Sequence, residues 1–284
     1  MNRNALLALA SLGLVLAGCP APTSTDPALL RVSAIPDQNP ANVRAQHLPL
    51  LGIACAKASV RCEWIDIDSY QGVVDALGNG SIDVAFLGGA TFVRAREEFG
   101  AIPLAIRDVD TRFSSTLVVR ADSSARRLED LRGKPFSFGN RSSTSGHVMA
   151  RYFLTRAGIE PERHFSRLEY SPNHDETLAR VASGSVAAGI SNSAVAYGAM
   201  ARGGRYAGVL RVVWETPPYI DYVWVARRDL PEGLRSRLVN AFLDLDRDVP
   251  EEADALRSEG AGGFLPPRAR EHAQVAEALR QVRP

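Results

Sequence analysis

The chain has 284 residues, of which 45% are hydrophobic and 23% are charged, and its formal net charge is +1. This composition predicts a packed globular body of one large domain or two modest ones. Because binding along a phosphate backbone needs clustered Lys and Arg, the balanced charge argues against a nucleic-acid-binding surface. A small-anion site needs only a few local donors, so it remains compatible with this charge.

The first residues have the pattern of an export signal. Arg3 precedes a short apolar run, 5–16, which is too short to span a bilayer as a helix, and the sequence LAGC then ends at Cys19. Small residues before a cysteine are typical of bacterial lipoproteins. We therefore expect a signal peptide over 1–18, lipidation of Cys19 and a Pro/Ser/Thr-rich tether over 19–27. An ordinary secretory signal with a chance cysteine is the alternative.

Two further cysteines, Cys55 and Cys62, follow in the mature chain. An oxidising compartment permits a disulfide between them, and two buried free thiols are the alternative. The five histidines, at positions 47, 147, 164, 174 and 272, are scattered without Cys/His metal spacing. No metal site is therefore expected.

Strands and helices alternate in the first part of the mature chain. Polar–apolar alternation or a continuous apolar run predicts strands at 30–35, 60–67 and 82–87. Helices are predicted at 41–56, at 70–77 with Ser69 as the N-cap, and at 91–99. This order predicts an α/β fold with a largely parallel sheet.

The remaining elements continue the α/β pattern. Strands are predicted at 116–120, 135–139, 186–191, 210–214 and 222–226, and helices at 128–131, 147–157, 177–182, 232–243, 251–259 and 267–280. Segments 73–85 and 177–189 share the same order of amphipathic helix, Gly-Ser and buried strand. Two similar α/β lobes would produce this repeated pattern, and convergence on a common helix–strand turn is the alternative.

The sharpest local signal is a run of small and hydroxyl residues over 139–146, between a predicted strand and a predicted helix. The first N–H groups of a helix have no internal partner, and the helix dipole favours negative charge there. Together with these amides, Ser143, Thr144 and Ser145 predict an oxyanion site, and a hydroxyl-rich cap without a ligand is the alternative. The run lacks the G-K-[ST] ending of a Walker A loop, so nucleotide hydrolysis is not expected.

Four other residues are predicted at the carboxyl end of a strand or the entrance to a helix: Tyr70, Gly88, Gly89 and His174. Ligands bind at this edge of open α/β sheets. Each residue could instead have only a structural role: Tyr70 as a half-buried aromatic, Gly88 and Gly89 as a turn, and His174 as a surface cap. Their shared position favours a single ligand site. A hydrolytic triad with Ser145 and His174 is not expected, because the G-x-S-x-G signature is absent, and no catalytic residue is assigned.

Six segments together resemble a known family. They are 34–40 (AIPDQNP), 73–77 (VVDAL) with Tyr70, 82–89 (IDVAFLGG), 143–149 (STSGHVM), 170–175 (YSPNHD) and 216–224 (TPPYIDYVW). The family is that of the phosphonate-binding receptors of ABC transporters, which includes phosphate- and phosphite-binding members and a branch named for selenate binding. The resemblance covers essentially the whole mature chain, and the combination is specific although no single segment is.

This resemblance implies a periplasmic-binding-protein-like type II fold, with two α/β lobes joined by two hinge strands. Lobe 1 is expected to comprise 28–117 and 213–284, and lobe 2 to comprise 118–212. The resemblance implies that Tyr70, Ser143, Thr144, Ser145 and His174 contact the oxyanion.

One stretch departs from the family pattern. Phosphonate-binding members hold a substrate amine with acidic side chains of the second lobe, whereas the corresponding stretch here, 189–193, has no carboxylate and offers Asn192 as the candidate ligand contact. Asp221 is then the remaining acidic candidate for ligand contact. The departure favours a smaller anion without a charged tail.

We therefore expect a lipid-anchored binding protein of an ABC importer, in the periplasm or on the outer face of the cytoplasmic membrane. It would hold a small tetrahedral oxyanion, namely a phosphonate, phosphite, phosphate or selenate-like ion, between its lobes, and would work with a permease and an ATPase. No cofactor, nucleic acid or enzymatic activity is expected. A ligand-sensing subunit for a signalling kinase and a secreted hydrolase are the alternatives.

Overall fold

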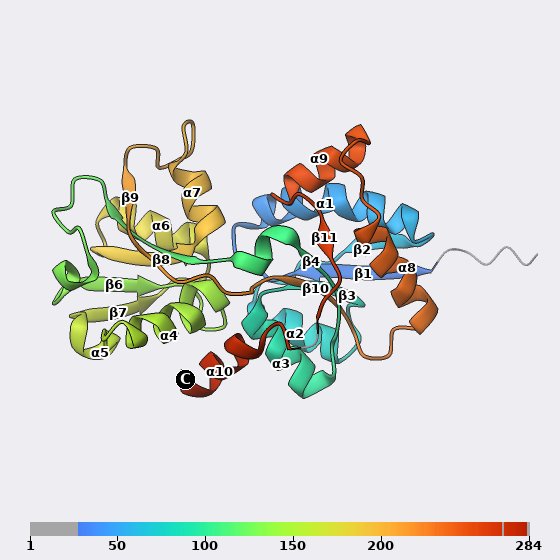
Figure 1. The fold of residues 1–284 in the computed structure, drawn as a ribbon, viewed down its shortest axis with the longest axis horizontal. Helices are drawn as coiled ribbons and strands as arrows, with labels where there is room; N and C mark the ends of the chain where they lie inside the picture. The colour runs from blue at the N-terminus through green and yellow to red at the C-terminus, as the bar shows by residue number, and fades with distance from the viewer. Residues whose placement is uncertain (1–27, 269, 283–284) are drawn as a thin grey trace, which may run out of the picture.

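The computed structural model describes residues 28–268 and 270–282. Two lobes lie side by side, each built on its own β-sheet with helices on both faces (Figure 1). Cys19 and the predicted signal peptide and tether, 1–27, lie outside the described residues. Within the described ranges, every helix is too short or too polar to cross a bilayer.

The first lobe contains a six-stranded sheet with the order β11-β4-β10-β3-β1-β2. Its strands are β1 (Leu29–Ala34), β2 (Arg61–Trp64), β3 (Val84–Leu87), β4 (Ile102–Arg107), β10 (Val223–Ala226) and β11 (Phe264–Leu265). β1 pairs in parallel with β2 and β3, and β10 runs antiparallel between β3 and β4. The helices are α1 (Pro40–Lys57), α2 (Tyr70–Gly78), α3 (Gly89–Phe99), α8 (Glu232–Leu243), α9 (Pro250–Ser258) and α10 (Ala273–Gln281).

The second lobe contains a five-stranded sheet with the order β7-β6-β8-β5-β9. Its strands are β5 (Ser115–Arg120), β6 (Pro135–Phe138), β7 (Arg167–Tyr170), β8 (Ala188–Asn192) and β9 (Leu210–Glu215). Its helical elements are η2 (Leu128–Leu131), η3 (Thr144–Val148), α4 (Met149–Arg156), α5 (Pro161–His164), α6 (His174–Ser183) and α7 (Ser193–Met200). In Figure 1, α6 and α7 lie on one face of this sheet, and α4 and α5 lie on the other.

Two segments connect the lobes. One leads from β4 through η1 (Asp108–Arg112) to β5, and the other leads from β9 to β10. They are bonded to each other, because the backbone N–H groups of Phe113 and Tyr219 each donate to the other residue's carbonyl, at 2.8 Å. The predicted fold, with two α/β lobes and two connections, is confirmed. The expectation of a largely parallel sheet is wrong, because β10 and β11 in the first lobe and β5 in the second pair antiparallel with their neighbours, so both sheets are mixed.

The structure differs from the sequence-based elements in a few places. Five elements were not predicted: β4, β7, β11, α5 and α7. The apolar run before Arg107 contains Pro103, and the small residues of α7 give no clear period. The last helix, predicted from residue 267, begins at Ala273. The helix predicted to begin at His147 begins at Thr144, as one wide turn that continues into α4. The turn is closed by the Val148 N–H, which donates to the Ser143 carbonyl at 3.0 Å.

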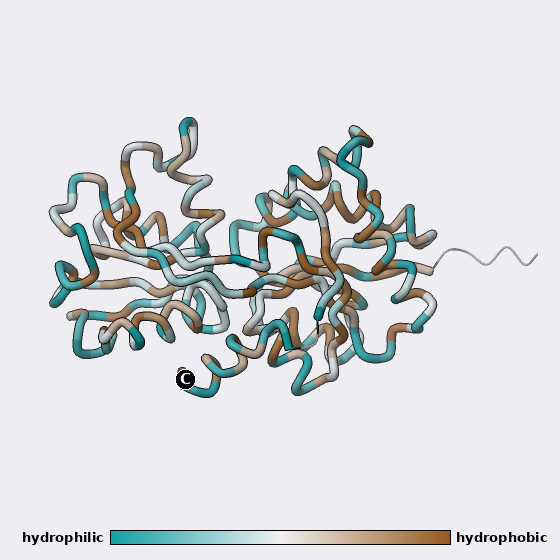
Figure 2. Tube along the Cα trace, viewed as in Figure 1, coloured by the Kyte–Doolittle hydropathy of each residue, from teal (hydrophilic) through white to brown (hydrophobic). Residues whose placement is uncertain are grey.

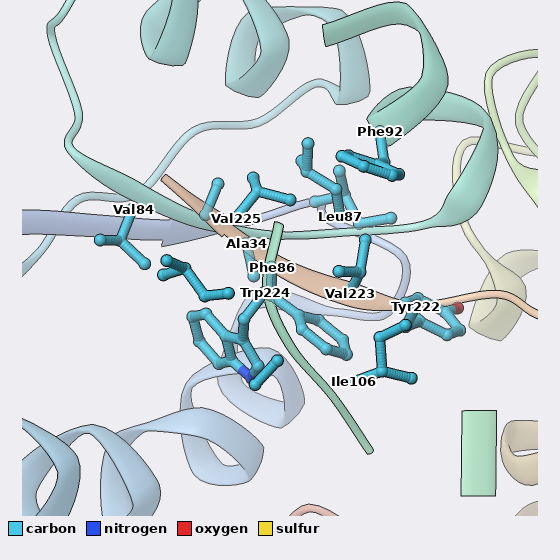
Figure 3. Packing of buried hydrophobic residues seen from close by; sticks show 14 of the residues in the cluster. Ala34, Val84, Phe86, Leu87, Phe92, Ile106, Tyr222, Val223, Trp224 and Val225 are labelled. Carbon is cyan, nitrogen blue, oxygen red and sulfur yellow. The ribbon is translucent and has the colours of Figure 1, made fainter. Parts of the chain in front are cut away.

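Hydrophobic residues concentrate along the central strands of each lobe, and polar residues cover the outer helices and loops (Figure 2). In the first lobe, Phe86 and Trp224 pack at the centre of the cluster, and Tyr222 lies at its edge with the hydroxyl pointing away from it (Figure 3). A disulfide joins Cys55 on α1 to Cys62 on β2. The core therefore places the first residues of β10, and the residues that precede them, next to the second lobe.

Candidate functional site

The predicted site residues meet where the strand ends of the two lobes face each other. Their side chains are between 0% and 4% exposed, and they come from both lobes and from the second connection: Tyr70, Ser143, Thr144, Ser145, His174, Asn192 and Asp221. Four helices at this edge begin with a side-chain cap, which Asn39, Ser69, Asn173 and Asn192 provide. We call the enclosed region around Tyr70, residues 143–145, His174 and Asp221 the niche.

The hydroxyl residues are held in a tight loop between β6 and η3. The N–H of Gly139 donates to the Gly146 carbonyl at 2.8 Å, and a Cβ built on either glycine would lie 3.0 Å from the Cα of the other. The Ser143 hydroxyl caps the turn by accepting from the Gly146 N–H at 3.0 Å. Glycine at both positions therefore allows the loop to fold back and to bury the three hydroxyl residues.

Thr144 connects the loop to the first lobe. Its Oγ1 accepts from the backbone N–H of Ala90 at 3.0 Å. A Cβ on Gly88 would lie 2.9 Å from that oxygen and 3.4 Å from Oδ1 of Asp221. Gly88 thus allows the second lobe to approach, whereas Gly89 donates its N–H to Asp221 Oδ1 at 2.9 Å.

His174 is a neutral donor in this arrangement. Its Nδ1 accepts from the backbone N–H of Asn192 at 3.3 Å, which leaves the proton on Nε2. Burial lowers the pKa of His174 to about 4. Nε2 lies 3.5 Å from the Ser145 hydroxyl, so its N–H is directed toward the hydroxyl loop.

Two buried polar atoms of the niche have no hydrogen-bond partner: the Tyr70 hydroxyl and Oδ2 of Asp221. Burial raises the pKa of Tyr70 well above its usual value, an effect that the nearby Ser143 side chain partly offsets. The Tyr70 and Ser143 hydroxyls nevertheless form no hydrogen bond with each other. Buried polar groups are almost always paired, so an unpaired donor and an unpaired acceptor in one region indicate a ligand site.

A hydrogen-bonded chain across the lobes forms one wall of the niche. Asn192 Nδ2 donates to the Tyr222 hydroxyl at 3.0 Å, and that hydroxyl donates to Asp37 Oδ2 at 2.7 Å. The other side of this wall faces a cavity of about 580 Å³, which Asp37, Asn192 and Tyr222 line but none of the niche residues do. Asn192 therefore lies in the wall, where its Oδ1 also caps α7 by accepting from the Val195 N–H at 2.7 Å.

Asp37 and Tyr222 were missed as site residues by the sequence reasoning. Both lie in segments that carry the family resemblance, but they are 185 residues apart and no local pattern relates them. The Asp37 carbonyl also accepts from the His174 N–H at 2.8 Å, and Asp175 Oδ2 accepts from the Asn39 N–H at 2.8 Å. These bonds join the two lobes, so the structure shows the closed arrangement.

Two α/β lobes, two paired connections and a closed niche between the lobes define a type II periplasmic binding protein. Residues 32–272 match the family model described as "ABC transporter, phosphonate, periplasmic substrate-binding protein". The chain therefore belongs to the periplasmic phosphonate-binding family of ABC transporter proteins.

Three comparisons with individual proteins agree with this assignment. The probable ABC transporter phosphite binding protein PhnD1 of Prochlorococcus marinus is 31% identical over 275 residues, which cover 92% of each chain. The phosphate-import protein PhnD of Mycolicibacterium smegmatis is 25% identical, over 84% of this chain and 81% of its own. The structure of the Prochlorococcus PhnD1 in complex with methylphosphonate superposes with a TM-score of 0.84 at 30% identity, covering 90% of this chain and 98% of that one. These relatives are substrate-binding proteins and not enzymes, as expected.

Proposed function

We propose that this protein is the receptor of an ABC importer for a small phosphorus oxyanion, namely phosphite, methylphosphonate or phosphate. The observation that carries the proposal is the niche itself: three hydroxyls, a neutral histidine N–H and an unpaired tyrosine hydroxyl in one closed region. Neutral donors that are fixed in place and shielded from water hold an oxyanion well. The lobes, proposed as 28–117 with 213–284 and 118–212, would close around the anion by bending at the two connections.

The wall of the niche supports a ligand without a long tail. The Asn192–Tyr222–Asp37 chain stands between the niche and the 580 Å³ cavity, so a tail directed toward that cavity would have to displace this hydrogen-bonded wall. Asn192 carries no charge with which to hold an amine, and the Asp37 carboxylate already accepts from Tyr222. We therefore expect aminoalkylphosphonates to bind more weakly than methylphosphonate.

The names of the relatives point to the same ligand class. The Prochlorococcus relative is named for phosphite binding and its structure holds methylphosphonate, and the mycobacterial relative is named for phosphate import. The shared fold and the niche of this chain make the same class the best candidate.

Calorimetric titration of ligand-free protein with phosphite, methylphosphonate, phosphate and 2-aminoethylphosphonate tests the proposal. At a free ligand concentration of one hundred times Kd, the preferred anion should raise the free energy of unfolding by about 2.7 kcal/mol. The protein is first unfolded and refolded to remove co-purified ligand. If it then binds none of these anions, the proposed function is refuted.

We further propose that signal peptide 1–18 is removed and that Cys19 is lipidated, with 19–27 as the tether to the membrane. The order of basic residue, apolar run, small residues and cysteine supports this. Metabolic labelling with an alkyne-tagged fatty acid should mark the wild type but not Cys19→Ser. Equal labelling of both would contradict the anchor.

A further inference from the structure

Another cavity lies at the junction of the two lobes, outside the niche. Its volume is about 470 Å³, and its walls come from α3 and α10 of the first lobe and from segment 141–148 of the second. Three arginines line it: Arg94 on α3, Arg280 on α10 and Arg141 in the loop before η3. We call this space the arginine cavity. None of the niche residues lines it, so the two spaces are separate.

The three guanidinium groups have no carboxylate partner. Within residues 28–268 and 270–282, no carboxylate oxygen lies within 4.0 Å of a side-chain nitrogen of Arg94, Arg141 or Arg280. By contrast, Arg107 and Arg227 each form ion pairs with carboxylates. Arginine N–H groups that no carboxylate occupies are available to an incoming anion.

Two of these arginines are held in place by neutral groups. Arg94 Nη1 donates to the Ser142 hydroxyl at 3.2 Å. The Cζ atom of Arg141 lies 3.6 Å from the centroid of the Tyr170 ring, and the Arg141 carbonyl accepts from His147 Nδ1 at 2.8 Å. Stacking uses the face of a guanidinium group and leaves its in-plane N–H donors free. Both side chains are therefore positioned without losing their ability to bind an anion.

The arginine cavity carries an excess of positive charge. Glu97 supplies the one carboxylate among the described residues that line it, against three arginines, so two positive charges remain uncompensated. Burial lowers the pKa of His147 in the same wall to about 4, and the positive charges of nearby arginines lower it further. The histidine is thus neutral near pH 7, and the charge of the cavity comes from the arginines.

The arginines come from both lobes. Arg94 and Arg280 belong to the first lobe and Arg141 to the second, and the bond from Arg94 to Ser142 crosses between them. α10 itself extends from the first lobe to contact α4 and η3 of the second (Figure 1). An anion held by all three arginines would therefore bridge the lobes.

We propose that the arginine cavity is a second binding site, for a small polyvalent oxyanion with two or more negative charges, such as a diphosphate or a tricarboxylate. Its volume lies in the range of small-molecule sites and exceeds what a single tetrahedral ion fills. The planar donor fork of arginine pairs with phosphate and carboxylate oxygens alike. This inference goes beyond the proposed function, because the niche holds its anion with neutral donors in an enclosed space, whereas this cavity uses charged and partly exposed ones.

Calorimetric titration with pyrophosphate and with citrate tests the site, in protein whose niche is filled by excess methylphosphonate. We expect at least one of the two anions to bind at one site per chain. Arg141→Gln and Arg280→Gln, one from each lobe, should each raise its Kd about tenfold, since hydrogen bonds to charged groups contribute about that factor. The Kd of methylphosphonate should stay unchanged in both variants.

Arg202→Gln is the matched control. Arg202 is also exposed and has no ion pair among the described residues, but it lies outside the cavity. Its removal lowers the net charge equally, so the Kd of pyrophosphate or citrate should equal that of the wild type.

Three results would overturn the inference: neither anion binds, the bound anion displaces methylphosphonate, or the three variants change its Kd alike. Failure of methylphosphonate to bind would instead count against the proposed function. The same titrations of ligand-free protein and its variants would then decide the second site by themselves.

Discussion

Two buried polar regions lie on either side of Tyr222, one within the first lobe and one between the lobes, and they differ in how completely their polar groups are paired. On one side, Arg107 bonds to both oxygens of Asp110, at 2.6 and 3.0 Å, and to Glu259, which in turn bonds to His47 at 2.7 Å. On the other side, the niche leaves the Tyr70 hydroxyl and Asp221 Oδ2 unpaired. Both regions are almost fully buried, so the difference lies in pairing and not in exposure.

This difference separates a structural role from a binding role. A buried charge cluster in which each charge has a partner holds β4, α1 and the end of α9 together. Unpaired donors and acceptors stabilise nothing in the protein itself, and they become useful when a ligand pairs with them. Stability should therefore depend on the cluster, and affinity on the niche.

The largest expected effect is on stability, from Arg107→Met. This change leaves Asp110 and Glu259 as buried charges without their main partner, so we expect a loss of about 3–5 kcal/mol in the free energy of unfolding. Urea unfolding monitored by circular dichroism measures it. Arg257→Met, which breaks an exposed ion pair with Asp254, is the matched control and should leave the unfolding midpoint unchanged. Equal midpoints for both variants would contradict the assigned role of the cluster.

A smaller effect is expected on affinity, from Ser145→Ala. Removing one hydroxyl that would contact a charged ligand should raise Kd about tenfold to a hundredfold, which is about 1.5–3 kcal/mol, with little change in unfolding of the ligand-free protein. Calorimetry and thermal unfolding measure the two quantities. Ser33→Ala sharpens the comparison, because the Ser33 hydroxyl is buried without a hydrogen-bond partner but lines a different cavity. We expect the Kd of Ser33→Ala to equal that of the wild type. If Ser33→Ala and Ser145→Ala lost affinity equally, a buried hydroxyl would not by itself identify the niche as the ligand site.

The sequence allowed the donors of the niche to be predicted because their signals are local. A strand, a run of hydroxyl residues and a helix define where Ser143 and Ser145 lie, and Ser69 marks the helix start that places Tyr70. The wall and the charge cluster could not be predicted in this way. Tyr222 and Asp37, or His47 and Glu259, come together only when the chain returns to the first lobe after forming the second. Asn192 shows the same limit: it was predicted as a candidate site residue, but its bond to Tyr222 depends on lobe closure.

The complete enclosure of the niche also has a kinetic consequence. The proposed contact residues are at most 4% exposed, so an anion inside has no open path to solvent while the lobes stay together. Its residence time is then set by how often the bonds from Asp37 and Asn39 to the second lobe break, and not by the strength of the donors alone. A permease that pulls the two lobes apart would speed up delivery without having to compete for the anion.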